Sequence, residues 1–445
     1  MSKLPLFFFY VLLLIPKIDV FRLPSTSITS KPEDLVAGMM QILLVLSFTI
    51  SLIRISRRTQ TGKLISLCGV YIFLISIVTM IFGGNIFYIF RYMLYFSMIL
   101  VAFVPTNDTA ARAIDKAALT VLIVYSVASI LQKTGMIGGI HTGQYVSDVS
   151  ERTTLIFTNS TEAGLISGVL FGIVLGLKER PRAKIVAFIC AVLINFLGQN
   201  RIALATLFLV ALVYVLRKKE ILLVFRLFKL RLGKRTVLVL FAIVIFIAVG
   251  ALSVYMPRAF VVTRETSLGD VIQLASVLVR NQIENDFVPS NISDYAFGRS
   301  SAEYDALDES LILRLQKWTY VVNILLSGYV FGIGAGNAIG DAIDGFYFRV
   351  LVETGFPGLL IYLVIFHRIS RISKLEVGGL AGLSYVLAIL LLQGAFLDSF
   401  YFSRVGYIFW LLIGIKLRAL GENHNPANYW VTTSMVGKAD ELENA

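Results

Sequence analysis

The chain has 445 residues, of which 57% are hydrophobic and only 15% are charged, and its mean hydropathy is +0.80. A soluble domain carries about 25% charged residues, so the composition excludes an ordinary soluble protein and predicts a polytopic membrane protein. The formal net charge of +12 does not indicate nucleic-acid binding, because the basic residues cluster in short segments between apolar runs, as orientation signals do. The two cysteines and three histidines are widely spaced, so neither a disulfide framework nor a metal site is predicted.

Apolar runs predict about twelve membrane-spanning helices, since one span needs roughly 20 apolar residues. Nine are predicted in residues 1–254, which include an external loop at 132–162, and three in residues 346–416. A polar tail at 417–445 ends the chain. The runs are Leu4–Phe21, Leu35–Ile53, Leu64–Phe82, Ile86–Val104, Ala117–Leu131, Ala163–Leu177, Ile185–Leu197, Ile202–Leu216, Thr236–Val254, Phe346–Phe366, Val377–Leu397 and Phe400–Ile415.

Lysine and arginine residues determine the predicted orientation, because they are enriched in cytoplasmic loops. With the N-terminus in the cytoplasm, 25 of the 40 Lys and Arg residues fall in cytoplasmic segments. Both termini are therefore predicted to be cytoplasmic. The segment 217–235 alternates basic with apolar residues, which is typical of an amphipathic helix lying on an anionic inner leaflet.

Residues 255–345 are predicted to form one large external loop. Structureless loops of that length are uncommon, so helices are expected within it, one of them at Leu307–Leu326. A glycine-rich turn at Gly332–Gly336 follows, and Asp344 is a candidate N-cap for the next span. Within that span, Pro357 removes a helix hydrogen bond and predicts a kink.

Several ionisable residues lie near the predicted external ends of spans, where charge is costly and marks function by default. Arg201 follows a very tight hairpin, Arg349 and Glu353 share one helix face because they are four residues apart, and Arg404 opens the last span. Guanidinium groups bind phosphate oxygens bidentately, so these arginines fit a lipid-linked diphosphate. Structural pairing or snorkelling of each charge stays open as the alternative. Asp344 is the candidate general base.

Three sequence motifs, in this order, resemble the O-antigen polymerase and ligase superfamily of bacterial membrane glycosyltransferases. The first is Gly198-Gln-Asn-Arg201-Ile-Ala-Leu, and the second is Arg314-Leu-Gln-Lys-Trp318. The third combines Gly332-Ile-Gly-Ala-Gly336, Asp344-Gly345-Phe-Tyr347 and Leu351-Val-Glu353-Thr-Gly355-Phe-Pro-Gly358-Leu. The resemblance covers roughly residues 185–366. Asp344 stands where the ligases usually have histidine, which favours a polymerase.

The resemblance implies an all-α, GT-C-like membrane protein with a large helical periplasmic loop, in the bacterial inner membrane. The implied reaction polymerises undecaprenyl-diphosphate-linked repeat units into O-antigen, or capsular or exopolysaccharide, without a metal or another cofactor. Arg201 and Arg314 would bind the diphosphate and stabilise the leaving group, and Asp344 would act as the base. Four further residues complete the candidate substrate-binding set: Arg152, Arg349, Lys317 and Tyr347.

The expected partners are the lipid-linked glycan donor and acceptor, the lipid bilayer and a chain-length regulator protein, and no nucleic acid. Two alternatives remain open. One is a ligase or oligosaccharyltransferase of the same superfamily, and the other is a polysaccharide flippase or transporter. Many transporters have two similar halves with the substrate site at the bilayer midplane, whereas the charges of this chain crowd the external ends of its predicted spans.

Overall fold

The computed structural model describes residues 4–14, 60–81, 99, 109–137, 153–157, 160–177, 180–217, 309–334, 345–375, 380–397, 399–400 and 403–422. Every regular element within these ranges is a helix and none is a strand, which confirms the all-helical class. The helices are α1 (Leu4–Leu14), α3 (Gln60–Ile81), α5 (Thr109–Lys133), α6 (Ser160–Leu175), α7 (Pro181–Leu197), α8 (Arg201–Arg217), α13 (Glu309–Leu326), α14 (Phe346–Ser373), α15 (Leu383–Gly394) and α16 (Ser403–Glu422).

Several predicted segments lie outside the described residues. They are the runs 35–53 and 236–254, nearly all of 86–104, the basic segment 218–235, loop residues 255–308 and the tail from 423 onward. The helix predicted at Leu307–Leu326 is confirmed as α13, two residues shorter at its start.

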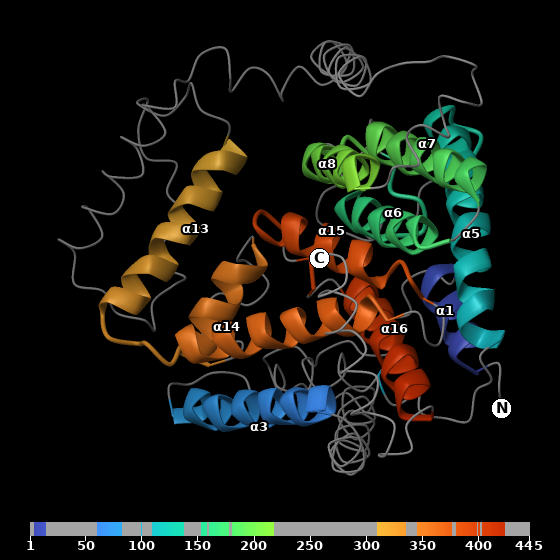
Figure 1. Ribbon diagram of the computed structural model, residues 1–445. Coiled ribbons are helices and arrows are strands. Elements are labelled where there is room, and N and C mark those ends of the chain that lie inside the picture. Colours follow the sequence, from blue (N-terminus) through green and yellow to red (C-terminus); the bar gives the residue numbers. More distant parts are fainter. Residues whose placement is uncertain are drawn as a thin grey trace, which may run out of the picture.

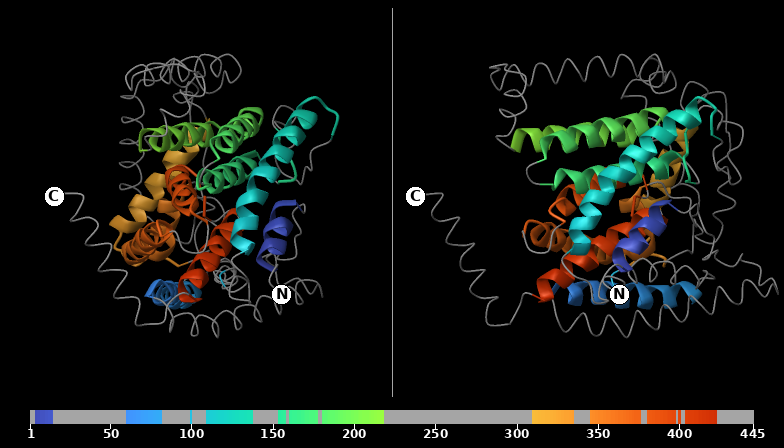
Figure 2. Two further views of the ribbon diagram at one scale, coloured as in Figure 1. Left: turned by 45° about the vertical axis from the view of Figure 1, so that its right-hand side comes forward. Right: turned by 90° about the vertical axis from the view of Figure 1, so that its right-hand side faces the viewer.

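Helix α6 occupies the centre of the bundle (Figure 1). It packs against α5, α7, α8, α15 and α16, and every residue from Glu162 to Leu175 is buried. A helix that is apolar on all sides lies in the interior of a large protein or of a membrane. The views in Figure 2 show α7 and α8 beyond one side of α6, with α15, α14 and α3 beyond the other.

A stripe of glycines lets α15 approach α6 closely. Gly168 and Gly172 on α6, and Gly176 just after it, face α15, while Gly164 continues the four-residue spacing and faces Asn195 and Asn200. A Cβ added to Gly172 would lie 2.8 Å from the backbone nitrogen of Val386 on α15, and one added to Gly176 would overlap the backbone at Gly382. Helices in membranes commonly pack through small residues in this way, because they let the two backbones come together.

Two of the described helices are long and apolar enough to cross a membrane: α14, and residues Ala113–Lys133 of α5. Of the other apolar helices, α1 and α15 are shorter than the predicted runs, whereas α3, α6, α7, α8 and α16 are longer. For example, α15 covers Leu383–Gly394 where Val377–Leu397 was predicted. Its helix starts late because the chain turns at Leu380, whose φ is 53°. Two candidate spans among the described residues are compatible with a helical membrane protein, and the twelve spans stay a prediction.

One end of the bundle collects the N-terminus of α6 and the ends of several neighbours. The Gln132 side-chain oxygen, at the end of α5, accepts hydrogen bonds from the backbone N–H groups of Thr154 and Leu155, at 3.1 and 2.9 Å. The Phe346 N–H, at the start of α14, donates to the carbonyl of Leu397, just after α15, at 3.1 Å. We call this end, with the α7–α8 hairpin and the start of α16, the α6 N-terminal end.

The opposite helix ends are tied together by buried lysines. Lys416 Nζ, on α16, donates to the carbonyl of Leu375, just after α14, at 2.6 Å. Lys184 Nζ, on α7, donates to the hydroxyl of Tyr214 on α8, also at 2.6 Å. Consecutive helices from α5 to α8 and from α14 to α16 therefore run in alternating directions, and each end of the bundle has its own set of polar contacts.

Candidate functional site

Arg201 lies at the first position of α8, directly after a tight hairpin. The C-cap of α7 is Gly198, whose N–H donates to Ile194 at 2.9 Å, and the Asn200 N–H donates to Asn195 at 2.9 Å. The hairpin also requires a left-handed residue, Gln199, with φ of 55°. These contacts confirm the predicted tight turn and hold Arg201, which is half-buried, at the α6 N-terminal end.

The segment 153–157 packs against this hairpin. The Thr153 N–H donates to the carbonyl of Leu197 at 3.3 Å, and the Asn200 amide donates to the carbonyl of Ser160 at 2.5 Å. The hairpin is therefore fastened to the residues that lead into α6. Arg152, one of the predicted substrate-binding residues, precedes Thr153 in the sequence and lies outside the described residues.

A buried ion pair joins α16 to α6 at the same end. Arg404 Nε lies 3.8 Å from Glu162 Oε1, and the two residues are only 6% and 3% exposed. The Arg404 guanidinium also lies over the ring of Phe157, 5.1 Å from its centroid, and that ring packs edge-on against Tyr125 at 5.5 Å. The sequence indicated Arg404 at the start of a span but gave no sign of its partner Glu162, because the two residues are far apart in the chain.

Helix α14 is broken near its middle, as the position of Pro357 predicted. The non-helical residue is Gly355, with φ of 67° and ψ of −170°. Proline has no N–H to donate, and the Phe356 N–H turns away from the helix to the carbonyl of Val330, at 3.0 Å. A chain segment from outside the helix thus supplies the contact that the helix loses at the break.

The glycine-rich turn after α13 fits into this break. The Ile333 N–H donates to the carbonyl of Val352 at 2.9 Å, and the Gly334 N–H donates to that of Glu353 at 3.0 Å. Gly332 has φ of 84°, and a Cβ there would lie 2.6 Å from the Gly355 nitrogen. Glycine is needed at Gly332 both for the left-handed backbone and for the close approach. Breaks in membrane helices are tolerated where neighbouring groups satisfy the freed backbone in this way.

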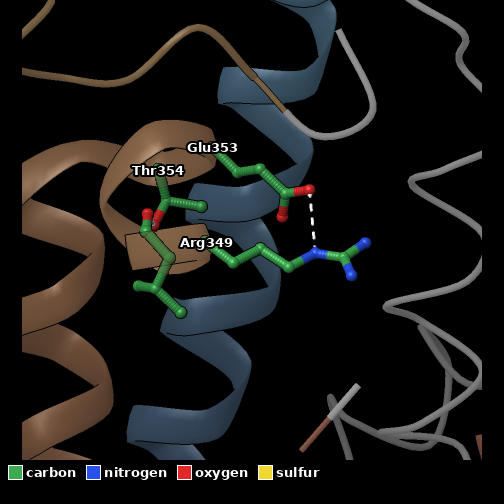
Figure 3. Close-up of polar contacts among 4 residues, drawn as sticks. Arg349, Glu353 and Thr354 are labelled. Carbon is green, nitrogen blue, oxygen red and sulfur yellow. Dashed lines mark hydrogen bonds and ion pairs between the residues drawn. The ribbon is translucent and has the colours of Figure 1, made fainter. Parts of the chain in front are cut away.

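Arg349 and Glu353 form a buried pair one turn before the break (Figure 3). Arg349 Nε donates to Glu353 Oε1 at 3.2 Å, and their side chains are 2% and 6% exposed. The predicted shared helix face is therefore confirmed. Thr354 points away from the pair in Figure 3 and donates to the carbonyl of Val350 at 2.7 Å. The Thr354 carbonyl accepts a hydrogen bond from the Tyr71 hydroxyl of α3, at 2.7 Å.

The remaining candidate residues lie around the junction of α13 and α14. Trp318 stacks on Phe348 with ring centroids 4.9 Å apart and planes inclined by 13°. The Tyr347 hydroxyl donates to the carbonyl of Leu391 at 2.9 Å, so it helps to hold α14 against α15. Lys317 is half-buried. Their roles in substrate binding stay predictions.

Two candidate catalytic groups lie outside the described part of the chain: the side chain of Arg314, whose backbone is in α13, and the whole of Asp344. The predicted N-cap role of Asp344 is wrong. The N-cap of α14 is Gly345, with φ of 109° and no side-chain cap. The Phe346 N–H is instead satisfied by the carbonyl of Leu397, and a Cβ on Gly345 would lie 3.2 Å from the carbonyl oxygen of Ala395.

Among the described residues, no group of three or more His, Cys, Asp and Glu side chains could hold a metal ion. No protein-family model and no curated protein matches this chain. The chemistry of the α6 N-terminal end and of the α14 break is therefore the basis for the function proposed below.

Proposed function

We propose that the chain is a polytopic membrane glycosyltransferase that polymerises undecaprenyl-diphosphate-linked repeat units on the external face of the bacterial inner membrane. One observation carries the proposal. Arg201, Arg349 and Arg404 belong to three different helices and all lie at the α6 N-terminal end, where Arg349 and Arg404 are only 1% and 6% exposed. Buried arginines are costly in a membrane and mark a ligand pathway by default.

The shared ends of the helices support the proposed sidedness. Gln132, Ser160, Asn200 and Leu397 all contribute to contacts at the α6 N-terminal end, and the topology derived from lysine and arginine puts all four outside. Lys184 and Lys416 take part in contacts at the other end and were predicted cytoplasmic. A twelve-span protein with both termini in the cytoplasm is consistent with this pattern.

In the proposed reaction, a hydroxyl at the non-reducing end of the acceptor repeat unit attacks the anomeric carbon of the donor glycan. The bond between that carbon and the diphosphate oxygen breaks, and undecaprenyl diphosphate leaves with the electron pair. Asp344 accepts the hydroxyl proton. Arg201 and Arg314 bind the diphosphate and stabilise the negative charge that grows on it, because preorganised donors are most effective where charge develops.

The glycine-rich turn attaches α13, which carries Arg314, to α14. Backbone hydrogen bonds from Ile333 and Gly334 fasten the end of α13 to the break in α14. The stack of Trp318 on Phe348 fastens its middle. The backbone of Arg314, one turn before Trp318, therefore belongs to a helix that packs on α14 rather than to a free loop.

The broken helix favours one second candidate, a polysaccharide transporter. Discontinuous helices with polar groups at the break form the substrate sites of many transporters, and α14 has a break at Gly355 beside the Arg349–Glu353 pair. A transporter would move lipid-linked glycan across the bilayer without changing its length. A polymerase lengthens the glycan and releases undecaprenyl diphosphate.

Deletion of the gene in its host tests the proposal. Electrophoresis of the surface glycan should show single repeat units in place of the polymer ladder, and the wild-type gene should restore the ladder. Arg201→Ala and Arg201→Lys should both fail to restore it, since an ammonium cannot reproduce the bidentate fork. Arg182→Ala, at an exposed arginine of α7, serves as the matched control. Loss of all external glycan, with lipid-linked repeat units retained inside the cell, would instead identify a transporter.

A further inference from the structure

Arg404 presents buried donors that the reaction above does not use. Its Nη1 and Nη2 atoms are fully buried, and neither has a hydrogen-bond partner in the part of the chain that the structure describes. Its ion-pair partner, Glu162, lies 3.8 Å from Nε. Native proteins keep very few buried polar atoms without partners, and each one needs a physical explanation.

The surroundings of Arg404 hold its guanidinium in one orientation. The Glu162 carboxylate lies on the Nε side at 3.8 Å, and the Phe157 ring covers one face, with its centroid 5.1 Å away. The edge formed by Nη1 and Nη2 is left to donate. Such an edge matches two coplanar oxygens of a phosphate or carboxylate group.

Other unpartnered polar atoms lie along the first two turns of α6. Both amide atoms of Gln393, which is fully buried, have no hydrogen-bond partner among the described residues, and its Nε2 is 3.5 Å from the Cβ position of Gly168. The Oδ1 of Asn195 likewise lacks a partner there and is 2.5 Å from the Cβ position of Gly164. Gly164 and Gly168 lie on a different face of α6 from Glu162, so the buried donors of Arg404 alone carry the inference that follows.

We propose that Arg404, oriented by Glu162, anchors a second oxyanion site at the α6 N-terminal end, distinct from the site of Arg201 and Arg314. This inference rests on the proposed function. A polymerase must hold two lipid-linked diphosphates at once, one on the donor and one on the acceptor, and a single arginine pair holds one of them. The contact from Asn200 to Ser160 joins the hairpin of Arg201 to the start of α6, so both sites belong to one end of the bundle.

Two groups on the same substrate present suitable oxygens: the diphosphate of the second lipid, and the carboxylate of an acidic sugar. Equilibrium binding to the full-length protein in lipid nanodiscs distinguishes them. Labelled undecaprenyl diphosphate should bind with two equivalents per chain, and Arg404→Gln should retain one equivalent while weakening the other at least tenfold. If the ligand is a sugar carboxylate, Arg404→Gln should instead weaken the binding of glucuronate by a similar factor.

Two further variants control for folding and for general loss of positive charge. Glu162→Gln combined with Arg404→Gln removes both charges of the pair, so no single buried charge remains, and it should lose the same equivalent. Arg371→Gln, at an exposed arginine near the end of α14, should bind as the wild type does.

Two results would contradict the inference, and they differ in what they leave standing. If Arg404→Gln binds both probes as the wild type does, while Arg201→Gln loses diphosphate binding, the second site is wrong and the proposed function stands. If the wild-type protein binds no undecaprenyl diphosphate at all, the proposed function fails together with this site.

Discussion

The described residues include two buried Arg–Glu pairs that are built in different ways. Arg349 and Glu353 are neighbours on one helix, and their hydrogen bond of 3.2 Å requires only that α14 forms. Arg404 and Glu162 come from α16 and α6, and their separation of 3.8 Å depends on the packing of the whole bundle. The local pair stabilises the helix beside its break. The long-range pair clamps two helices and leaves one edge of a guanidinium available for a ligand.

The helices that carry the two pairs also use glycine differently. In α14, Gly355 adopts a left-handed conformation with φ of 67°, which breaks the helix. In α6, Gly172 stays helical, and its missing side chain makes room for the backbone of α15. One helix therefore uses glycine for backbone conformation and the other for close packing. Substitutions at Gly355 and Gly172 can therefore test the two roles separately.

The largest effect is expected from removing one charge of a pair. Glu162→Ala and Glu353→Ala should each lower the free energy of unfolding by about 3–5 kcal/mol, because a buried arginine is left uncompensated. The neutral double variants, with glutamine at both positions, should recover much of the loss. Denaturant unfolding of the purified protein in detergent measures these differences. A cost below about 1 kcal/mol for Glu162→Ala would show that this pair is not buried.

Glycine-to-alanine variants separate the cost of backbone conformation from the cost of side-chain packing. Their effects on the free energy of unfolding should be somewhat smaller than those of the charge variants. Gly355→Ala should cost about 1–2 kcal/mol for the left-handed backbone and about 1–3 kcal/mol more for overlap with Val330 and Phe331. Two controls isolate these terms. Gly135→Ala has φ of 77° and open space around it, so only the first term applies, and Gly172→Ala meets only the second. Equal unfolding midpoints for all three would contradict this account.

The sequence predicted the local half of this comparison well. Pro357 indicated a kink, the four-residue spacing predicted that Arg349 and Glu353 share a face, and the helix α13 was expected near its observed position. Each of these depends on residues close together in the chain. The segment Gly332–Gly336 was correctly expected to turn. Its hydrogen bonds to the break in α14 could not be predicted, because they join residues some twenty positions apart in the chain.

Double-mutant cycles measure the coupling energy within each pair, which should lie between about 0.5 and 3 kcal/mol. The coupling energy between Arg349 and Glu353 should exceed that between Arg404 and Glu162, since the first pair makes a hydrogen bond at 3.2 Å and the second is only an ion pair at 3.8 Å. Unfolding free energies of the single and double glutamine variants give both values. A larger coupling for the long-range pair would reverse the assigned roles.

The smallest effects concern single hydroxyl groups that fasten α14 to its neighbours. Tyr71→Phe removes a hydrogen bond to the Thr354 carbonyl beside the break, and Tyr347→Phe removes one to the Leu391 carbonyl. Each should cost about 1 kcal/mol. If Tyr71 supports the break, its variant should also reduce polymer formation more than Tyr347→Phe does. Equal activities at equal stability would exclude that role.

The contacts of α6 with α16 and α15 could not be predicted from the sequence. Glu162 opens α6 after a segment that looks like any external loop, and nothing near it in the chain indicates Arg404 as its partner. The glycine stripe from Gly164 to Gly176 did carry a usable signal, since its four-residue period predicts a close helix contact. Its partner, α15, could be identified only from the packing.

The central proposal is that this chain joins lipid-linked repeat units through arginine-bound diphosphates. The most direct measurement incubates the purified protein in lipid nanodiscs with undecaprenyl-diphosphate-linked repeat units and follows glycan length by electrophoresis. The wild type should produce a ladder of polymers and release undecaprenyl diphosphate, and Arg201→Ala should produce neither. Unchanged single repeat units with the wild-type protein, or a full ladder with Arg201→Ala, would contradict the claim.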